Sequence, residues 1–168
     1  MGRKKYIIAT FSTRKGQMAT IVKTVDDMTQ DLSRFVNAQC EVFQDALEEI
    51  KSGGKRSHWM WFIFPQLYGL GQSEKSKLYG IRSLREANDY LTHPILGPRL
   101  EQATRAVLES KIHPSEVFGE VDYQKFISCM TLFKQVALAD SVFASALEKF
   151  CVIDKKTIEL LGENNDNL

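Results

Sequence analysis

The chain has few of the residues that stabilise disulfide-rich or metal-dependent folds. Its 168 residues include three cysteines, three histidines and four prolines. Cys40, Cys129 and Cys151 are odd in number and widely spaced, which argues against a disulfide framework and predicts reduced, buried thiols. Cys129 is a candidate catalytic thiolate because Ser128 and Thr131 lie nearby, but its apolar segment favours a core thiol. No histidine spacing fits a metal site, so we predict no metal and no other cofactor.

Long apolar runs are also missing. A membrane-spanning helix needs roughly 20 consecutive apolar residues, and no segment approaches that length. The run Tyr6–Ile8 is too short for the apolar part of a signal peptide. We therefore expect a soluble, cytoplasmic protein without a membrane partner.

Acidic residues are absent from the first 25 positions, which hold six lysines and arginines. The rest of the chain contains 16 basic and 21 acidic residues, so its net charge is −5 although that of the whole chain is +1. Clustered basic side chains can bind phosphate by releasing counterions. The composition nevertheless favours a solvated, partly disordered extension over residues 1–25, with at most weak contact to nucleic acid.

The remaining composition, with 43% apolar and 26% charged residues, is that of an ordinary globular protein with one core. Apolar residues recur every three or four positions from after Asp26 to about Lys51, which predicts one long helix that Gly53–Gly54 ends. Shorter helices with the same periodicity are expected further along the chain. They are expected up to His93–Pro94, from about Pro98, from Asp122 to Ala137, and from Ser141 to Phe150.

Polar residues mark the beginnings of these helices. Ser83 and Glu86 have the spacing of a capping box, and Asp122 and Ser141 are expected N-caps. The only candidate strands are Tyr6–Phe11 and Trp59–Phe64, and periodicity does not distinguish such short apolar runs from buried helix. We therefore predict an all-α, bundle-like single domain over residues 26–161 with a buried aromatic segment, and a polar tail over residues 162–168.

The most unusual segment extends from Ser57 to Ser76. It contains both tryptophans of the chain within the apolar run Trp59–Phe64, and polar groups border that run on both sides. Six large apolar residues in succession indicate a core or a pocket wall. Hydrogen-bonding side chains at both borders are more than packing alone requires.

This segment belongs to a longer series of motifs: Arg34–Val36, Ala38–Gln39, Gly54–Gln66, Gly69–Gly71, Ser73, Ser76, Tyr79, Glu86–Ala87, Tyr90–Leu91, His93–Pro94, Leu96–Gly97, Arg99–Leu100, Phe118–Gly119, Asp122, Lys125 and Met130–Phe133. In these motifs the chain resembles the family called domain of unknown function 1810. The resemblance extends from about Asp31 to Leu161, and it implies a compact, mostly helical single domain without an assigned activity. Two places depart from the family pattern, because Cys129 stands where the family usually has serine and the stretch 149–154 is shorter.

The polar members of this pattern are the candidate site. If they converge on one cleft, it would have an aromatic wall, hydroxyl groups and two or three cations, which suits a nucleotide-like or phosphate-bearing ligand. The ligand-binding candidates are Lys55, Trp59, Trp61, Gln66, Ser73, Ser76, Tyr79 and Thr131.

Three classes of function remain open from the sequence. An enzyme would use His58 as general acid or base, Asp122 as its partner and Lys125 to stabilise an anion, as a hydrolase or transferase of a nucleotide or ADP-ribose-type substrate. A binding protein would use the same cleft without proton transfer, and a protein-interaction domain would need no cleft. The same residues also have purely structural interpretations. The serines and Asp122 would cap helices, His58 would be a hydrogen-bonded structural histidine, and the tryptophans would pack in the core.

Overall fold

The computed structural model describes residues 6–12, 18–24 and 31–165, with side chains described for residues 31–163. The chain divides into two compact units, Met1–Leu32 and Ser33–Leu168. No helix in the described part of the chain is long and apolar enough to cross a membrane.

The first unit contains an antiparallel β-hairpin. Strand β1 (Tyr6–Ser12) pairs with β2 (Met18–Thr24), in a register that places Tyr6 opposite Thr24 and Ser12 opposite Met18. The strand expected at Tyr6–Phe11 is therefore present. The second strand was not predicted, although its threonine, isoleucine and valine residues are favourable in strands. Most of the basic residues of the predicted extension lie outside the described residues.

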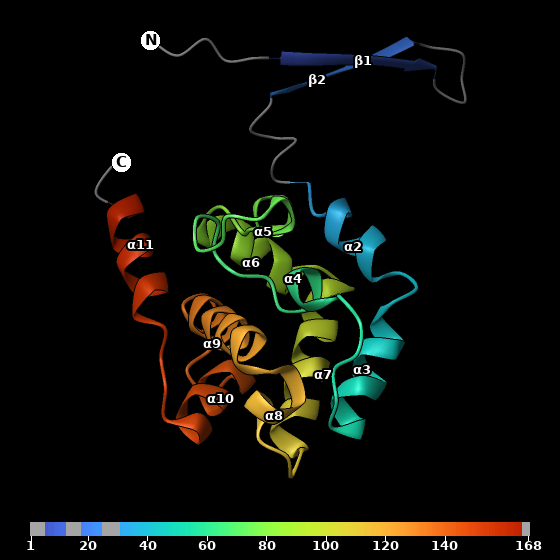
Figure 1. Ribbon diagram of the computed structural model, residues 1–168. Coiled ribbons are helices and arrows are strands. Elements are labelled where there is room, and N and C mark those ends of the chain that lie inside the picture. Colours follow the sequence, from blue (N-terminus) through green and yellow to red (C-terminus); the bar gives the residue numbers. More distant parts are fainter. Residues whose placement is uncertain (1–5, 13–17, 25–30, 166–168) are drawn as a thin grey trace. The chain divides into compact units, whose positions relative to one another are not determined.

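The second unit is helical, and the prediction of an all-α fold is confirmed there (Figure 1). Apart from the helices, its described residues contain one isolated bridge, between Leu67 and Ile81. The helices are α2 (Ser33–Gln39), α3 (Phe43–Ser52), α4 (Met60–Ile63), α5 (Glu74–Tyr79), α6 (Leu84–Thr92), α7 (Leu96–Glu109), α8 (Pro114–Phe118), α9 (Glu120–Lys134), α10 (Val142–Phe150) and α11 (Lys155–Asn165).

The prediction of one long helix from after Asp26 to about Lys51 is wrong. Its first residues lie outside the described part, and the rest is divided into α2 and α3 by a turn at Cys40–Val42. The side-chain amide of Gln39 is buried there and donates to the carbonyl of Phe62 at 2.7 Å and to the hydroxyl of Tyr90 at 3.0 Å. These tertiary hydrogen bonds fix the end of α2, and periodicity does not reveal them. Gly53 ends α3 in the left-handed conformation, as predicted.

The expected caps are present in two of three places. The hydroxyls of Ser83 and Ser141 accept hydrogen bonds from the backbone at the starts of α6 and α10. Asp122 is not an N-cap, because α9 begins at Glu120 and Asp122 lies within its first turn. The two His-Pro pairs were predicted only as helix ends, yet Nδ1 of His113 also accepts the backbone N–H of Ser115 at the start of α8.

Helix α9 lies at the centre of the second unit and packs against α4, α6, α8, α10 and α11 (Figure 1). The predicted buried aromatic segment is confirmed, but it forms the short helix α4 and its flanks rather than a strand. Its rings pack edge to face and tilted with rings of α8 and α9, including Phe64 against Phe126 with centroids 5.0 Å apart. This packing fixes the segment in the core.

The three cysteines differ in environment. Cys129 is fully buried in α9, and burial raises the pKa of its thiol well above the usual value, so the core-thiol interpretation is supported. Cys40 and Cys151 are exposed, which corrects the expectation that all three thiols are buried. No described group of histidine, cysteine and acidic side chains could hold a metal ion.

Candidate functional site

The segment that enters the site is held by the buried carboxylate of Glu49 in α3. Its oxygens accept hydrogen bonds from the backbone N–H of Arg56 at 2.7 Å, from the N–H and hydroxyl of Ser57 at 3.1 and 2.7 Å, and from the indole Nε1 of Trp59 at 2.9 Å. Burial raises the pKa of Glu49, but these hydrogen bonds outweigh it and lower the pKa to about 2. A carboxylate that is ionised at neutral pH therefore fixes the loop 55–59.

The two tryptophans have different environments. Trp59 is fully buried, and its ring packs against Phe64 and Phe118. Trp61 is only partly buried, and the ammonium groups of Lys75 and Lys125 lie 4.8 and 4.6 Å from its ring centroid. Only Trp61 is thus placed to meet a ligand, and two cations already contact its ring.

A carboxylate organises the lysines near Trp61. Asp122 accepts from Nζ of Lys125 at 2.7 Å and from Nζ of Lys55 at 2.8 Å, and all three side chains are largely buried. Desolvation raises the pKa of Asp122, but the hydrogen bonds and charges of Lys125 and Lys55 outweigh it, so that the pKa lies below its usual value. We call Lys55, Trp61, Lys75, Asp122 and Lys125 the lysine–tryptophan cluster.

A small cavity adjoins this cluster. It is lined by Trp61, Gln66, Ser76, Tyr79 and Gly80, and its volume of about 10 Å³ is close to what one water molecule occupies. The indole N–H of Trp61 is buried and has no hydrogen-bond acceptor among the described residues. Four of the predicted ligand-binding residues therefore converge on a single point, but the space between them is far smaller than a nucleotide.

The other predicted site residues do not line this cavity. The hydroxyl of Ser73 caps α5 and contacts that of Ser76 at 2.8 Å. His58 is exposed and has no hydrogen bond or ion pair with a described residue, so Asp122 is paired with lysines rather than with His58. Thr131 is fully buried in α9 and accepts the backbone N–H of Asp154 at 3.0 Å.

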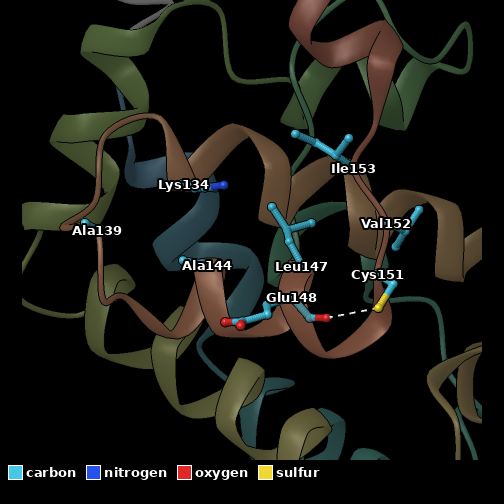
Figure 2. A pocket seen from close by; sticks show the side chains of 8 residues that line it. All are labelled: Lys134, Ala139, Ala144, Leu147, Glu148, Cys151, Val152 and Ile153. Atoms are coloured by element: carbon cyan, nitrogen blue, oxygen red, sulfur yellow. Dashed lines mark hydrogen bonds between the residues drawn. The ribbon is translucent and has the colours of Figure 1, made fainter.

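A much larger hollow lies elsewhere, at the C-terminal ends of α9 and α10 (Figure 2). It has a volume of about 490 Å³ and contains one lysine and one exposed cysteine, whose thiol donates to the carbonyl of Glu148 at 3.4 Å. None of the predicted site residues lines it. Its lining consists of Lys134, Ala139, Ala144, Leu147, Glu148, Cys151, Val152 and Ile153.

Comparisons with known proteins agree with the resemblance that the motifs indicated. Residues 29–161 match the model of a family described as a protein of unknown function, DUF1810. The chain belongs to this family. The crystal structure of the conserved hypothetical protein Rv1873 from Mycobacterium tuberculosis is similar, with a TM-score of 0.76 and 45% sequence identity over 79% of this chain and 96% of that one. No curated protein matches at a significant level.

Two contributors to the site were missed from the sequence. Lys75 contacts Trp61 although only its neighbours Ser73 and Ser76 belong to the motif. Glu49 fixes the loop before Trp61, and the signal for it was an acidic residue three positions after the buried Ala46, next to the apolar stripe of α3. Both act on residues close in sequence but outside their own helix, and the periodicity of a helix gives no information about such contacts.

Proposed function

We propose that the protein binds a small anionic ligand, nucleotide-like or phosphate-bearing, at the lysine–tryptophan cluster. The observation that carries this proposal is the pair of ammonium groups 4.6 and 4.8 Å from the ring centroid of a partly exposed tryptophan. Cations beside an aromatic ring can bind two parts of one ligand. The ammonium groups attract a phosphate, and the aromatic face stacks against a flat ring.

The charge balance supports an anion as the ligand. The cluster contains three lysines and one carboxylate, and Asp122 bridges Lys55 and Lys125 with both of its oxygens. The single negative charge of Asp122 holds the ammonium groups of Lys55 and Lys125 in place. It does not pair with the third ammonium group, which belongs to the exposed Lys75. An incoming phosphate would therefore meet a preorganised positive site.

A nucleobase would gain from Trp61 as well. Stacking of a base on an aromatic side chain contributes about 1–3 kcal/mol. Trp59 offers no such surface because its ring is buried on all sides. Trp61 is thus the residue that we assign to stacking.

The proposal is for binding, and a reaction has less support. A carboxylate whose pKa lies below its usual value is a weak proton acceptor at neutral pH, and Asp122 is such a group. His58 is not hydrogen bonded to Asp122 or Lys125. A hydrolase or transferase of ADP-ribose-type substrates would need a contact between His58 and Asp122 that the described structure does not contain.

A protein-interaction domain is the second candidate. Leu138 is 79% exposed in the turn between α9 and α10, and neighbouring residues of this turn line two surface hollows. Exposed apolar surface marks an interaction site when it forms a contiguous patch, so this function requires Leu138 and the walls of these hollows to form one. The three free thiols are typical of a reducing compartment, so we place either function in the cytoplasm.

The test is a thermal-shift measurement with ATP, ADP-ribose, ribose 5-phosphate and inorganic phosphate at millimolar concentration. A ligand present at ten times its Kd stabilises the folded protein by about 1.4 kcal/mol. For a chain of this size, that raises Tm by about 3–6 °C. We expect this increase for at least one nucleotide with the wild type and not with Trp61→Leu. If the folded wild type shows no increase with any of the four compounds, the proposed function is wrong.

A further inference from the structure

Helix α5 is the least buried helix that flanks the lysine–tryptophan cluster. None of its six residues is buried, Leu78 is 54% exposed, and the side chain of Glu74 is 94% exposed. Segments with few buried contacts open at low free energy compared with the core. This helix is therefore suited to move while the rest of the fold remains intact.

The C-terminal end of α5 is well anchored. The ring of Tyr79 packs against those of Phe62 and Phe35, with centroids 5.3 and 5.8 Å apart. The guanidinium of Arg34 donates to the carbonyl of Leu78 at 2.9 Å and to that of Gly80 at 3.3 Å. This end can act as a pivot.

The N-terminal end of α5 has much weaker attachments. The hydroxyl contacts of Ser73 and Ser76 are internal to the helix. Toward the rest of the protein, the ammonium of Lys75 lies over Trp61, and Ser76 lines the small cavity beside the same ring. Lys75 is exposed and has no ion pair with a described residue, so its contact with Trp61 is the main polar attachment of this end.

Gly71 permits the close approach of this end to the preceding loop. A Cβ atom at Gly71 would lie 2.5 Å from Oγ of Ser76, and a Cβ atom at Gly80 would lie 2.9 Å from the backbone of Ser76 and Tyr68. Glycine thus stands on both sides of α5 at points of tight contact. The absence of a side chain at both positions lets α5 in its closed position pack directly against the chain on either side.

We propose that α5 is a lid over Trp61, and that Lys75 holds it closed. The lid turns about its C-terminal end, so that Lys75 leaves the tryptophan ring and Ser76 leaves the cavity. The flat part of the ligand then takes the place of Lys75 on the ring, and the freed ammonium binds the phosphate when the lid closes again. The identity of the ligand in this inference rests on the proposed function, whereas the opening of the lid does not.

The opening is tested without a ligand by acrylamide quenching of tryptophan fluorescence in the full chain. Lys77 is the matched control for Lys75, because it lies on the same helix and pairs only with the exposed Glu74 at 3.3 Å. We expect Lys75→Ala to raise the quenching constant at least about twofold and Lys77→Ala to leave it unchanged. Trp59 is fully buried and contributes an unquenched background. Equal quenching constants for the two folded variants would overturn the lid.

Amide hydrogen exchange of the wild type provides a second measurement. We expect the amides of α5 to exchange at least about 100-fold faster than those of the central helix α9, and equal protection of the two helices would also overturn the lid.

Failure of the lid and failure of the proposed function give different results. If a nucleotide raises Tm but the two variants quench alike, the lid is wrong and the ligand stands; if Lys75→Ala raises quenching but nothing binds, the lid stands and the proposed ligand is wrong.

Discussion

Glu49→Ala is expected to lower the free energy of unfolding by about 3–5 kcal/mol, because it leaves several neutral donors without their acceptor and a buried unpaired donor costs about 1–3 kcal/mol. The substitution orphans four donor groups, among them the indole N–H of the fully buried Trp59. Equilibrium denaturation in urea measures the loss. The control is Glu48→Ala, at the adjacent exposed position of α3, for which we expect a change within about 0.5 kcal/mol. Equal losses for the two variants would contradict the assigned role of Glu49.

The same carboxylate predicts a pH dependence. The pKa of Glu49 falls from 4.5 to about 2 on folding, so its contribution is complete above pH 4.5 and is lost as the pH falls from there toward 2. Denaturation of the wild type between pH 5 and pH 2 should show this loss, and Glu49→Gln should show correspondingly less pH dependence. If the two proteins have identical pH profiles, the carboxylate is not held ionised by these hydrogen bonds.

Lys125→Met is expected to weaken the binding of the proposed ligand by about 10–100-fold, because a hydrogen bond to a charged group contributes about 1.5–3 kcal/mol. Lys125 is the only residue of the described part that contacts both the ring of Trp61 and the carboxylate of Asp122. Its removal also leaves Asp122 to neutralise Lys55 alone. Isothermal titration with the nucleotide that gives the largest thermal shift measures the effect.

The matched control for Lys125 lies on the same helix. Lys134 is exposed at the end of α9 and lines the larger hollow, so Lys134→Met tests the competing location with the same chemical change (Figure 2). We expect Lys134→Met to leave the affinity unchanged within about twofold. A loss of affinity in Lys134→Met but not in Lys125→Met would place the ligand in the larger hollow and would contradict the assignment to the lysine–tryptophan cluster.

Local signals in the sequence predicted much of the fold. Helix periodicity, the caps at Ser83 and Ser141 and the glycine stop at Gly53 all depend on interactions within a few residues, and the structure contains them. The break after Gln39 depends instead on Phe62 and Tyr90, which are distant in sequence. Neither propensity nor periodicity contains that information. The domain boundaries over residues 1–25, 26–161 and 162–168 stay predictions.

The sequence predicted several residues of the candidate site, but it did not predict how their side chains are arranged in space. Trp61, Gln66, Ser76 and Tyr79 meet at one cavity as the motif suggested. Whether a polar residue of the motif faces that cavity depends on the helix face on which it lies and on what covers it. Thr131 is covered by the segment before α11, through the N–H of Asp154, and Trp59 is covered by the aromatic core. These are tertiary facts that a linear motif does not contain.

The most direct test of ligand binding at the lysine–tryptophan cluster is a proton–nitrogen NMR titration of the two indole N–H groups. The Trp59 group donates to Glu49 in the core, whereas that of Trp61 has no acceptor in the described structure. Substitution of each tryptophan by phenylalanine assigns the two signals. We predict that a nucleotide at millimolar concentration shifts the Trp61 signal and leaves the Trp59 signal in place. If the Trp61 signal does not move, or if only that of Trp59 moves, the proposed site is wrong.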